Sequence, residues 1–200
     1  MNKKKQINNL INNLDISLDE TNLKRHTIHT GPLIRREKIY SDLDIAERYK
    51  IFSKLFHFTR KVDIKYQNII VNKKQTKLIT DINNKISKQL SNIVKENLYY
   101  FQKFDKIIIY YDDGQLPLAN ILISVFTSWF QDKFEYRVVN PQEYKLFQTA
   151  DLICTLSLIE HKLNEGKALS ASEIKFFRSP RTLKINYLKY LKKIKFHYKN

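Results

Sequence analysis

The sequence contains few residues that interrupt helices. Only three glycines and four prolines occur in 200 residues, which favours long helices and argues against turn-rich β-sandwiches, collagen-like repeats and low-complexity linkers. Three glycines are also too few for a Walker loop, a dinucleotide fingerprint or a nucleophile elbow, and the sequence contains none of these motifs. Catalysis that depends on such glycine-rich loops is therefore excluded.

Cysteine and long apolar runs are scarce as well. Cys154 is the one cysteine, so no internal disulfide can form, and its apolar neighbours predict a buried thiol in a reducing compartment. No apolar run reaches the roughly 18 to 20 residues that a membrane-spanning helix needs. Asparagines interrupt the basic N-terminus, which does not match a secretory signal. We expect a cytoplasmic protein with no membrane partner.

Carboxylates are few relative to cations. Thirty-six Lys and Arg against 20 Asp and Glu give a formal charge of +16 and a pI near 9.7. Such an excess attracts polyanions through counterion release and electrostatic steering. The alternative is compositional drift in an A- and T-rich genome, since Lys, Asn and Ile are all abundant. The arginines at 35, 36 and 48 favour nucleic acid as the partner, because drift would not select arginine there.

Hydrophobic spacing predicts alternating helices and strands. The expected helices cover residues 4–14, 41–62, 76–98, 116–130, 143–163 and 170–177, and the expected strands cover 63–72, 106–111 and 134–139. A basic helical tail follows at residues 181–196. This order is typical of an α/β protein with a largely parallel sheet flanked by helices. No linker divides the chain, so we expect a single domain over residues 1–200.

The strand at 106–111 ends on two adjacent aspartates, Asp112 and Asp113. Loops at the carboxyl ends of parallel strands commonly carry ligand-binding residues. Because strand side chains alternate between faces, only one of the two can point where Tyr110 points. The alternative interpretation, stronger for Asp113, is a turn aspartate that caps the following helix.

A second carboxylate, Asp151, is embedded in an apolar helical stretch. A buried carboxylate needs a cation or several hydrogen-bond donors, so Asp151 is a candidate metal ligand or the partner of a nearby Lys or Arg. Gln148 lies one helical turn earlier and shares the face of Asp151.

The stretch "HTIHTGPLIRRE" supplies a third group of candidates. His26 and His29 are three residues apart, but the extended pattern around them separates their side chains, and a zinc site is not expected. Arg35 and Arg36 follow the Gly-Pro break and are suited to bidentate contacts with phosphate. Alternatively, they are solvated residues at the start of a helix.

Four stretches together resemble a bacterial domain-of-unknown-function family that is common near phages and mobile elements and similar in fold to ribonuclease H. They are "IHTGPLIRREKIY", "YYDDGQ", "YKLFQTADLICTLSLIEHKL" and "LSASEIKFFRSPRTLKINYL". The resemblance implies a three-layer sheet flanked by helices, with a core at residues 26–165 and a C-terminal helical extension at 166–200.

The resemblance also implies a metal site with Mg²⁺ or Mn²⁺ that cleaves phosphodiesters. Asp112 and Asp151 match its catalytic metal ligands. Asp113 stands where relatives often have asparagine. It is expected to support the metal ligands without binding the metal itself. His29 matches the histidine ahead of Gly-Pro and is expected to position water or phosphate. From the residues themselves, Gln148 is expected to hydrogen-bond the same ligand as Asp151, and Arg35 and Arg36 to contact the substrate's phosphate.

The sequence departs from this family at its start. Relatives open with a strand that carries Asp-Glu-Ser-Gly, whose aspartate is the central metal ligand, and no stretch of this chain matches it. We therefore expect an N-terminally truncated fold, weak metal binding, poor cleavage, and self-association through an exposed sheet edge.

Two functions follow as hypotheses. The first is a metal-dependent nuclease or phosphoryl transferase acting on nucleic acid. The second is a non-catalytic nucleic-acid-binding or accessory protein of a phage or mobile element. A degraded gene product without function is a third interpretation, which persistent insolubility would favour.

Overall fold

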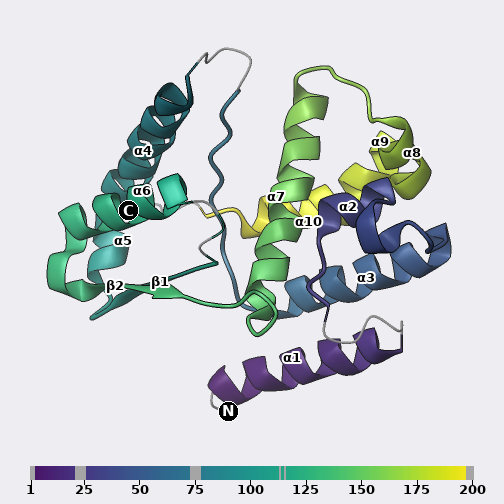
Figure 1. Cartoon of the computed structure of the whole chain (residues 1–200), viewed down its shortest axis with the longest axis horizontal. Coiled ribbons are helices and arrows are strands. Elements are labelled where there is room, and N and C mark those ends of the chain that lie inside the picture. Colours follow the sequence, from purple (N-terminus) through teal and green to yellow (C-terminus); the bar gives the residue numbers. More distant parts are fainter. Residues whose placement is uncertain (1–2, 21–25, 73–77, 113, 115, 197–200) are drawn as a thin grey trace. The chain divides into compact units, whose positions relative to one another are not determined.

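The computed structural model describes residues 3–20, 26–72, 78–112, 114 and 116–196 (Figure 1). The chain divides into two compact units. The first combines the described residues up to 66 with residues 141–196, and the second comprises those between 67 and 140. The predicted single domain over residues 1–200 stays a prediction.

The first unit is built from helices. In chain order these are α1 (Lys3–Asp19), α2 (Thr30–Arg35), η1 (Lys38–Tyr40), α3 (Ile45–Lys61), α7 (Lys145–Asn164), α8 (Ala171–Phe177), α9 (Pro180–Leu183), η4 (Lys184–Leu188) and α10 (Lys189–Ile194). Helix α2 contacts α3, α7 and α8, so this short helix lies at the centre of the unit (Figure 1).

Capping boxes fix where two of these helices begin. Asp44 accepts a hydrogen bond from the amide of Glu47, whose side chain accepts one from the amide of Asp44. Ser170 and Glu173 form the same reciprocal pair at the start of α8. Such pairs satisfy amides that have no partner inside the helix. Helix α3 therefore begins after Asp44, slightly later than the expected start at Ser41.

The core of the first unit joins α3 and α7 to the C-terminal helices. Its completely buried aliphatic residues include Ile51 and Leu55 of α3, Leu152 and Leu156 of α7, and Leu183 and Leu191 near the C-terminus. Phe52 packs edge-to-face against Phe176, Phe177 and Tyr187. Aromatic pairs of this geometry add stabilisation beyond the area they bury. The basic C-terminal segment is thus an integral part of this unit's core.

The second unit contains the sheet. Its elements are α4 (Ile79–Glu96), α5 (Leu98–Gln102), β1 (Ile107–Tyr111), α6 (Leu116–Phe130), η3 (Gln131–Lys133) and β2 (Phe134–Val138). Strands β1 and β2 are parallel, with Ile107 opposite Phe134 and Tyr111 opposite Val138. Helix α6 forms the crossover between them, and its Val125, Phe126 and Phe130 pack with Val94 of α4.

The expected three-layer, ribonuclease H-like sheet is wrong. Among the described residues the one sheet has two strands, and helices dominate both units. The predicted strand at 63–72 makes one isolated bridge, from Tyr66 to Lys195. A strand needs a neighbour that pairs with it along its length, and among the described residues strand pairing within 63–72 is limited to that bridge.

Local predictions agree more closely with the structure. Helices α4, α6, α7 and α8 and strands β1 and β2 lie within a few residues of their expected ranges. Helix α1 continues to Asp19, so Asp15 and Asp19 lie in a helix and not in a connection after the helix expected at residues 4–14. In the described part of the chain, the helices are too short or too polar to cross a bilayer.

Candidate functional site

Asp151 on α7 is tied to the first turn of α2. Its Oδ2 atom accepts a hydrogen bond of 2.6 Å from the backbone amide of Thr30, which is completely buried. The first amides of a helix have no partner within that helix. The residue before Thr30, His29, provides no side-chain cap, so a carboxylate 121 residues away supplies the acceptor. Asp151 itself is half-buried.

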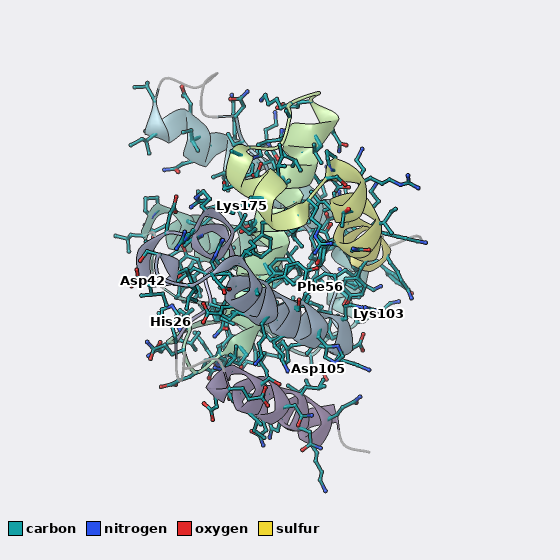
Figure 2. All side chains as sticks on the ribbon, turned by 90° about the vertical axis from the view of Figure 1, so that its right-hand side faces the viewer. His26, Asp42, Phe56, Lys103, Asp105 and Lys175 are labelled. Atoms are coloured by element: carbon teal, nitrogen blue, oxygen red, sulfur yellow. The ribbon has the colours of Figure 1, made fainter. Side chains whose placement is uncertain are left out.

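The segment ahead of α2 places two histidines beside Tyr40. The amide of His29 donates a 3.0 Å hydrogen bond to the Tyr40 hydroxyl. The ring of His26, labelled in Figure 2, lies 6.0 Å from the Tyr40 ring and 6.3 Å from the His29 ring, between centroids. Burial and the neighbouring His29 lower the pKa of His26, which favours its neutral form. The His29 side chain is exposed, whereas the adjacent Thr30 is completely buried.

Several polar atoms near this junction have no hydrogen-bond partner within the described part of the chain. They are both amide atoms of Gln148, the hydroxyl of Thr30 and Nε2 of His26. Gln148 is only 1% exposed and lies one turn before Asp151 on α7. Leaving such groups unpaired is costly, and in native proteins they usually meet water or a ligand. We call His26, His29, Thr30, Gln148 and Asp151 the polar cluster.

Arg35 and Arg36 make local contacts. Arg35 donates from Nε to Glu37 at 2.8 Å, and Arg36 donates from Nε to the carbonyl of Ser41 at 2.7 Å. Arg36 also ends α2 in the left-handed conformation, with φ of 63°. Both side chains are exposed. Their predicted contact with phosphate stays a prediction.

Asp112 belongs to the second unit, whereas Asp151 belongs to the first. Asp112 is exposed, and its Oδ1 accepts a hydrogen bond of 3.2 Å from the amide of Gly114. This is the local bond of a turn aspartate. Asp113 lies outside the described residues.

The polar cluster alone does not supply the carboxylates of the two-metal centre that the resemblance implies, and that centre stays a prediction. No three of the described His, Cys, Asp and Glu side chains lie close enough together to hold a metal ion. Asp151 is the only carboxylate of the polar cluster, and one of its oxygens is already bonded to Thr30. Hard divalent cations prefer several oxygen ligands, and the polar cluster offers fewer than such a centre needs.

A basic surface on the C-terminal helices is the other notable feature. Beyond Glu173 the chain has eight Lys and Arg up to Lys195 and no Asp or Glu. Seven of these cations lie on the outer side of the helices: Lys175, Arg178, Arg181, Lys184, Lys189, Lys192 and Lys193. Among the described residues, only Lys192 of these seven forms an ion pair, at 3.5 Å from Glu160.

A π-helical turn aligns part of this surface. Lys189 donates its amide hydrogen to the carbonyl of Lys184, five residues earlier. On a regular α-helix, residues five apart would face about 140° away from each other. The wider turn brings Lys184 and Lys189 towards the same side, and Arg181, Lys192 and Lys193 are exposed on the neighbouring turns. We call these five residues the basic ridge.

Local sequence patterns did not predict the roles of Thr30 and Tyr40 or the π-helical turn. Thr30 contributes through its backbone amide, which every non-proline residue has, and Tyr40 lies at the far end of the stretch that contains His29. The five-residue step from Lys184 to Lys189 was visible in the sequence, but only as an irregularity in the spacing of lysines.

Comparison of the chain with protein-family models, with curated proteins and with solved structures finds no match. The resemblance to a ribonuclease H-like family therefore stays a prediction. Function has to be argued from the polar cluster and the basic ridge themselves.

Proposed function

We propose that this chain is a nucleic-acid-binding protein whose basic ridge holds the phosphate backbone. The observation that carries the proposal is the run of cations after Glu173, which contains no carboxylate. An exposed cation without a nearby carboxylate keeps its charge available for phosphate, because no internal ion pair has to be broken. Arginine and lysine contacts with phosphate dominate affinity for nucleic acids.

The helices that carry the basic ridge are packed into the core of the first unit. Leu183, Tyr187, Leu188, Leu191 and Ile194 of the same helices are buried. The backbone that carries the cations is therefore fixed before a ligand arrives. Binding then costs mainly the ordering of long side chains, which keeps the entropic penalty low.

The test is a salt titration with fluorescent strands about 20 nucleotides long, single and duplex. Each phosphate contact contributes about −0.7 (single strand) to −0.9 (duplex) to the slope of log affinity against log salt concentration. Changing Arg181, Lys184, Lys189 and Lys193 to Gln should reduce the slope's magnitude by about 3 and weaken binding roughly 10- to 100-fold at low salt.

The matched control removes the same charge elsewhere. Lys61, Lys88, Lys95 and Lys133 are exposed and lie outside the ridge. Their fourfold change to Gln should leave the slope nearly unchanged. Equal losses in both variants would show that binding is diffuse, and absence of binding by the parent chain would refute the proposal.

A metal-dependent nuclease is the second candidate. The observation that favours it is the polar cluster, in which a half-buried carboxylate lies one helical turn from a buried, unpaired amide. The scarcity of carboxylates around Asp151 argues against it. Calorimetric titration of Mn²⁺ into the parent, Asp112→Asn and Asp151→Asn chains separates the cases. Micromolar binding lost in both variants would support a shared site, and no binding by the parent would exclude a metal centre in this chain.

A further inference from the structure

A cavity of about 370 Å³ opens between α3 and the end of α8 in the first unit. Ile45, Ala46, Tyr49 and Lys50 line it from α3, and Lys175, Phe176 and Arg178 line it from the other side. Figure 2 labels Lys175 on this helix. The volume falls within the range of sites for small organic ligands.

The charge of this cavity has one sign. Among the described residues that line it, Lys50, Lys175 and Arg178 carry charge and none is a carboxylate. Within the described residues, Lys175 and Arg178 have no ion pair, and Lys50 lies 3.9 Å from a carboxylate oxygen of Glu20 at the surface. Three cations around one opening favour an anionic ligand, and the guanidinium of Arg178 can bind two phosphate oxygens at once.

The cavity also offers an aromatic face. Tyr49 is 39% exposed, and its ring centroid lies 5.7 Å from that of the buried Phe176. The Tyr49 hydroxyl forms a 2.5 Å hydrogen bond with the hydroxyl of Tyr187. A partly exposed ring that is held by a neighbouring ring and by a hydrogen bond to its hydroxyl can stack on a planar ligand with little further loss of freedom.

An adjoining cavity of about 150 Å³ adds polar groups. It shares Tyr49, Phe176 and Arg178 with the first and also includes Asn186. A side-chain amide carries both donors and an acceptor, which match the edge of a nucleobase. The two cavities together combine a stacking ring, an amide and cations.

The backbone at Arg178 is strained. Its φ of 68° and ψ of −47°, with the amide of Ser179 donating to the carbonyl of Phe177 at 2.8 Å, define a γ-turn with positive φ. This turn is rare for residues with a side chain. Strained residues cluster at ligand sites, where the surrounding structure holds them. The turn fixes the starting direction of the Arg178 side chain at the cavity.

We infer that this cavity binds a nucleotide, with its base stacked on Tyr49 and its phosphate held by Lys175 and Arg178. The cations of the cavity favour a charged ligand over an apolar one. The Tyr49 ring favours a ligand with a planar base over a simple anion. The inference rests on the proposed function only for the source of the ligand. That source is either a free nucleotide or the phosphorylated end of a strand held at the basic ridge.

The first experiment titrates adenosine 5′-monophosphate, adenosine and inorganic phosphate into the full chain by calorimetry. The monophosphate should bind at least tenfold more tightly than either part. Similar affinities for all three, or no binding of the monophosphate, would overturn the inference.

Three variants locate the site. Arg178→Gly removes the cation and suits the positive φ, so it should keep the fold and weaken nucleotide binding at least tenfold. Tyr49→Leu should weaken it to a similar extent. Tyr49→Phe keeps the ring but not the bond to Tyr187 and should retain binding within about threefold. Unchanged binding in Arg178→Gly and Tyr49→Leu would place the nucleotide elsewhere.

A last comparison separates this inference from the proposed function. Strands with and without a 5′-phosphate are titrated into the parent and Arg178→Gly chains. A preference for the phosphorylated strand that disappears in the variant supports a strand end as the ligand. If the monophosphate binds but strands show no preference, the ligand is a free nucleotide. Salt-dependent strand binding with neither effect would refute the nucleotide site and leave the basic ridge intact.

Discussion

The amide of Thr30 and the carboxylate of Asp151 are joined by a 2.6 Å hydrogen bond across 121 residues of sequence. The bond fixes the start of α2 against the middle of α7. It also helps to position His29, whose amide is held by Tyr40. A single carboxylate thus organises the segment that carries most of the polar cluster.

Replacing Asp151 by Ala should destabilise the first unit. The amide of Thr30, a completely buried residue, would lose its acceptor, at a cost of about 2 kcal/mol. Asp151→Asn keeps an acceptor oxygen and should cost less than half as much. Urea unfolding of the three chains measures the difference, and equal stabilities would show that the bond is unimportant in solution.

Replacing Gln148 should not destabilise the chain, in contrast to replacing Asp151. Its buried amide has no partner within the described chain, so replacement by Met, which has a similar volume, removes an unsatisfied polar group. We expect Gln148→Met to equal or exceed the parent in stability, by up to about 2 kcal/mol. The same urea titration serves as the measurement. A loss of that size would instead mean that an internal water satisfies the amide.

Local pattern was enough to predict most helices and both strands, since the residues that decide them are neighbours in the sequence. Helix α6 and strand β1 show this clearly, because their apolar spacing alone predicts them. The failure at residues 63–72 has the opposite cause. Their β-branched content is typical of a strand, but a strand exists only if another segment pairs with it, and such pairing is not encoded locally.

Part of the polar cluster could be predicted from the sequence, because local patterns single out some of its residues. Apolar neighbours single out Asp151 and Gln148, and the Gly-Pro break draws attention to His29. Cys154 shows the limit of this reasoning: its apolar neighbours predict burial, yet it is exposed on α7. Helical rotation, and not local composition, decides which face a residue occupies.

Arg48 should be more important for stability than its residue type suggests. It is 3% exposed, and its guanidinium donates to the carbonyls of Leu33 and Ile34 at the end of α2, at 2.9 and 3.1 Å. Arg48→Met should destabilise the chain by about 3 kcal/mol, because two buried carbonyls lose a charged donor. Arg36→Met, at an exposed position, is the control and should cost far less. Thermal unfolding monitored by circular dichroism compares the two.

Stability should fall above about pH 10. Burial raises the pKa of Tyr40, and burial with the Tyr49 hydrogen bond raises the pKa of Tyr187, above the ordinary value of 10. Between the unfolded and folded values the unfolded chain has lost protons that the folded chain retains, so stability decreases as pH rises. Below pH 10 this contribution is constant.

Tyr187→Phe should make that decline shallower, and Tyr99→Phe, which changes an exposed ring, should not. Urea unfolding at about pH 9, 10 and 11 brackets the ordinary tyrosine pKa and gives the slopes. Lysine deprotonation affects all three chains alike. An identical slope in Tyr187→Phe and the parent would show that Tyr187 ionises normally in the folded chain.

Cys154 provides a direct probe of the charge on Asp151. Although Cys154 is exposed, partial desolvation by its neighbours, and then the nearby Asp151 carboxylate, raise the pKa of its thiol, so little thiolate is present at neutral pH and alkylation should be slow. Asp151→Asn removes the negative charge, lowers the thiol pKa and should speed the reaction with iodoacetamide several-fold at about pH 8. Because Cys154 is the one cysteine of the chain, mass spectrometry reads its modification without ambiguity.

The control for this probe is Asp63→Asn, which removes a charge at an exposed position on another segment and should leave the alkylation rate unchanged. The comparison isolates the electrostatic effect, because both variants lose one negative charge and only one of them loses it beside the thiol. If both variants react at the parent's rate, the carboxylate of Asp151 does not influence this face of α7, and its assignment to the polar cluster would have to be reconsidered.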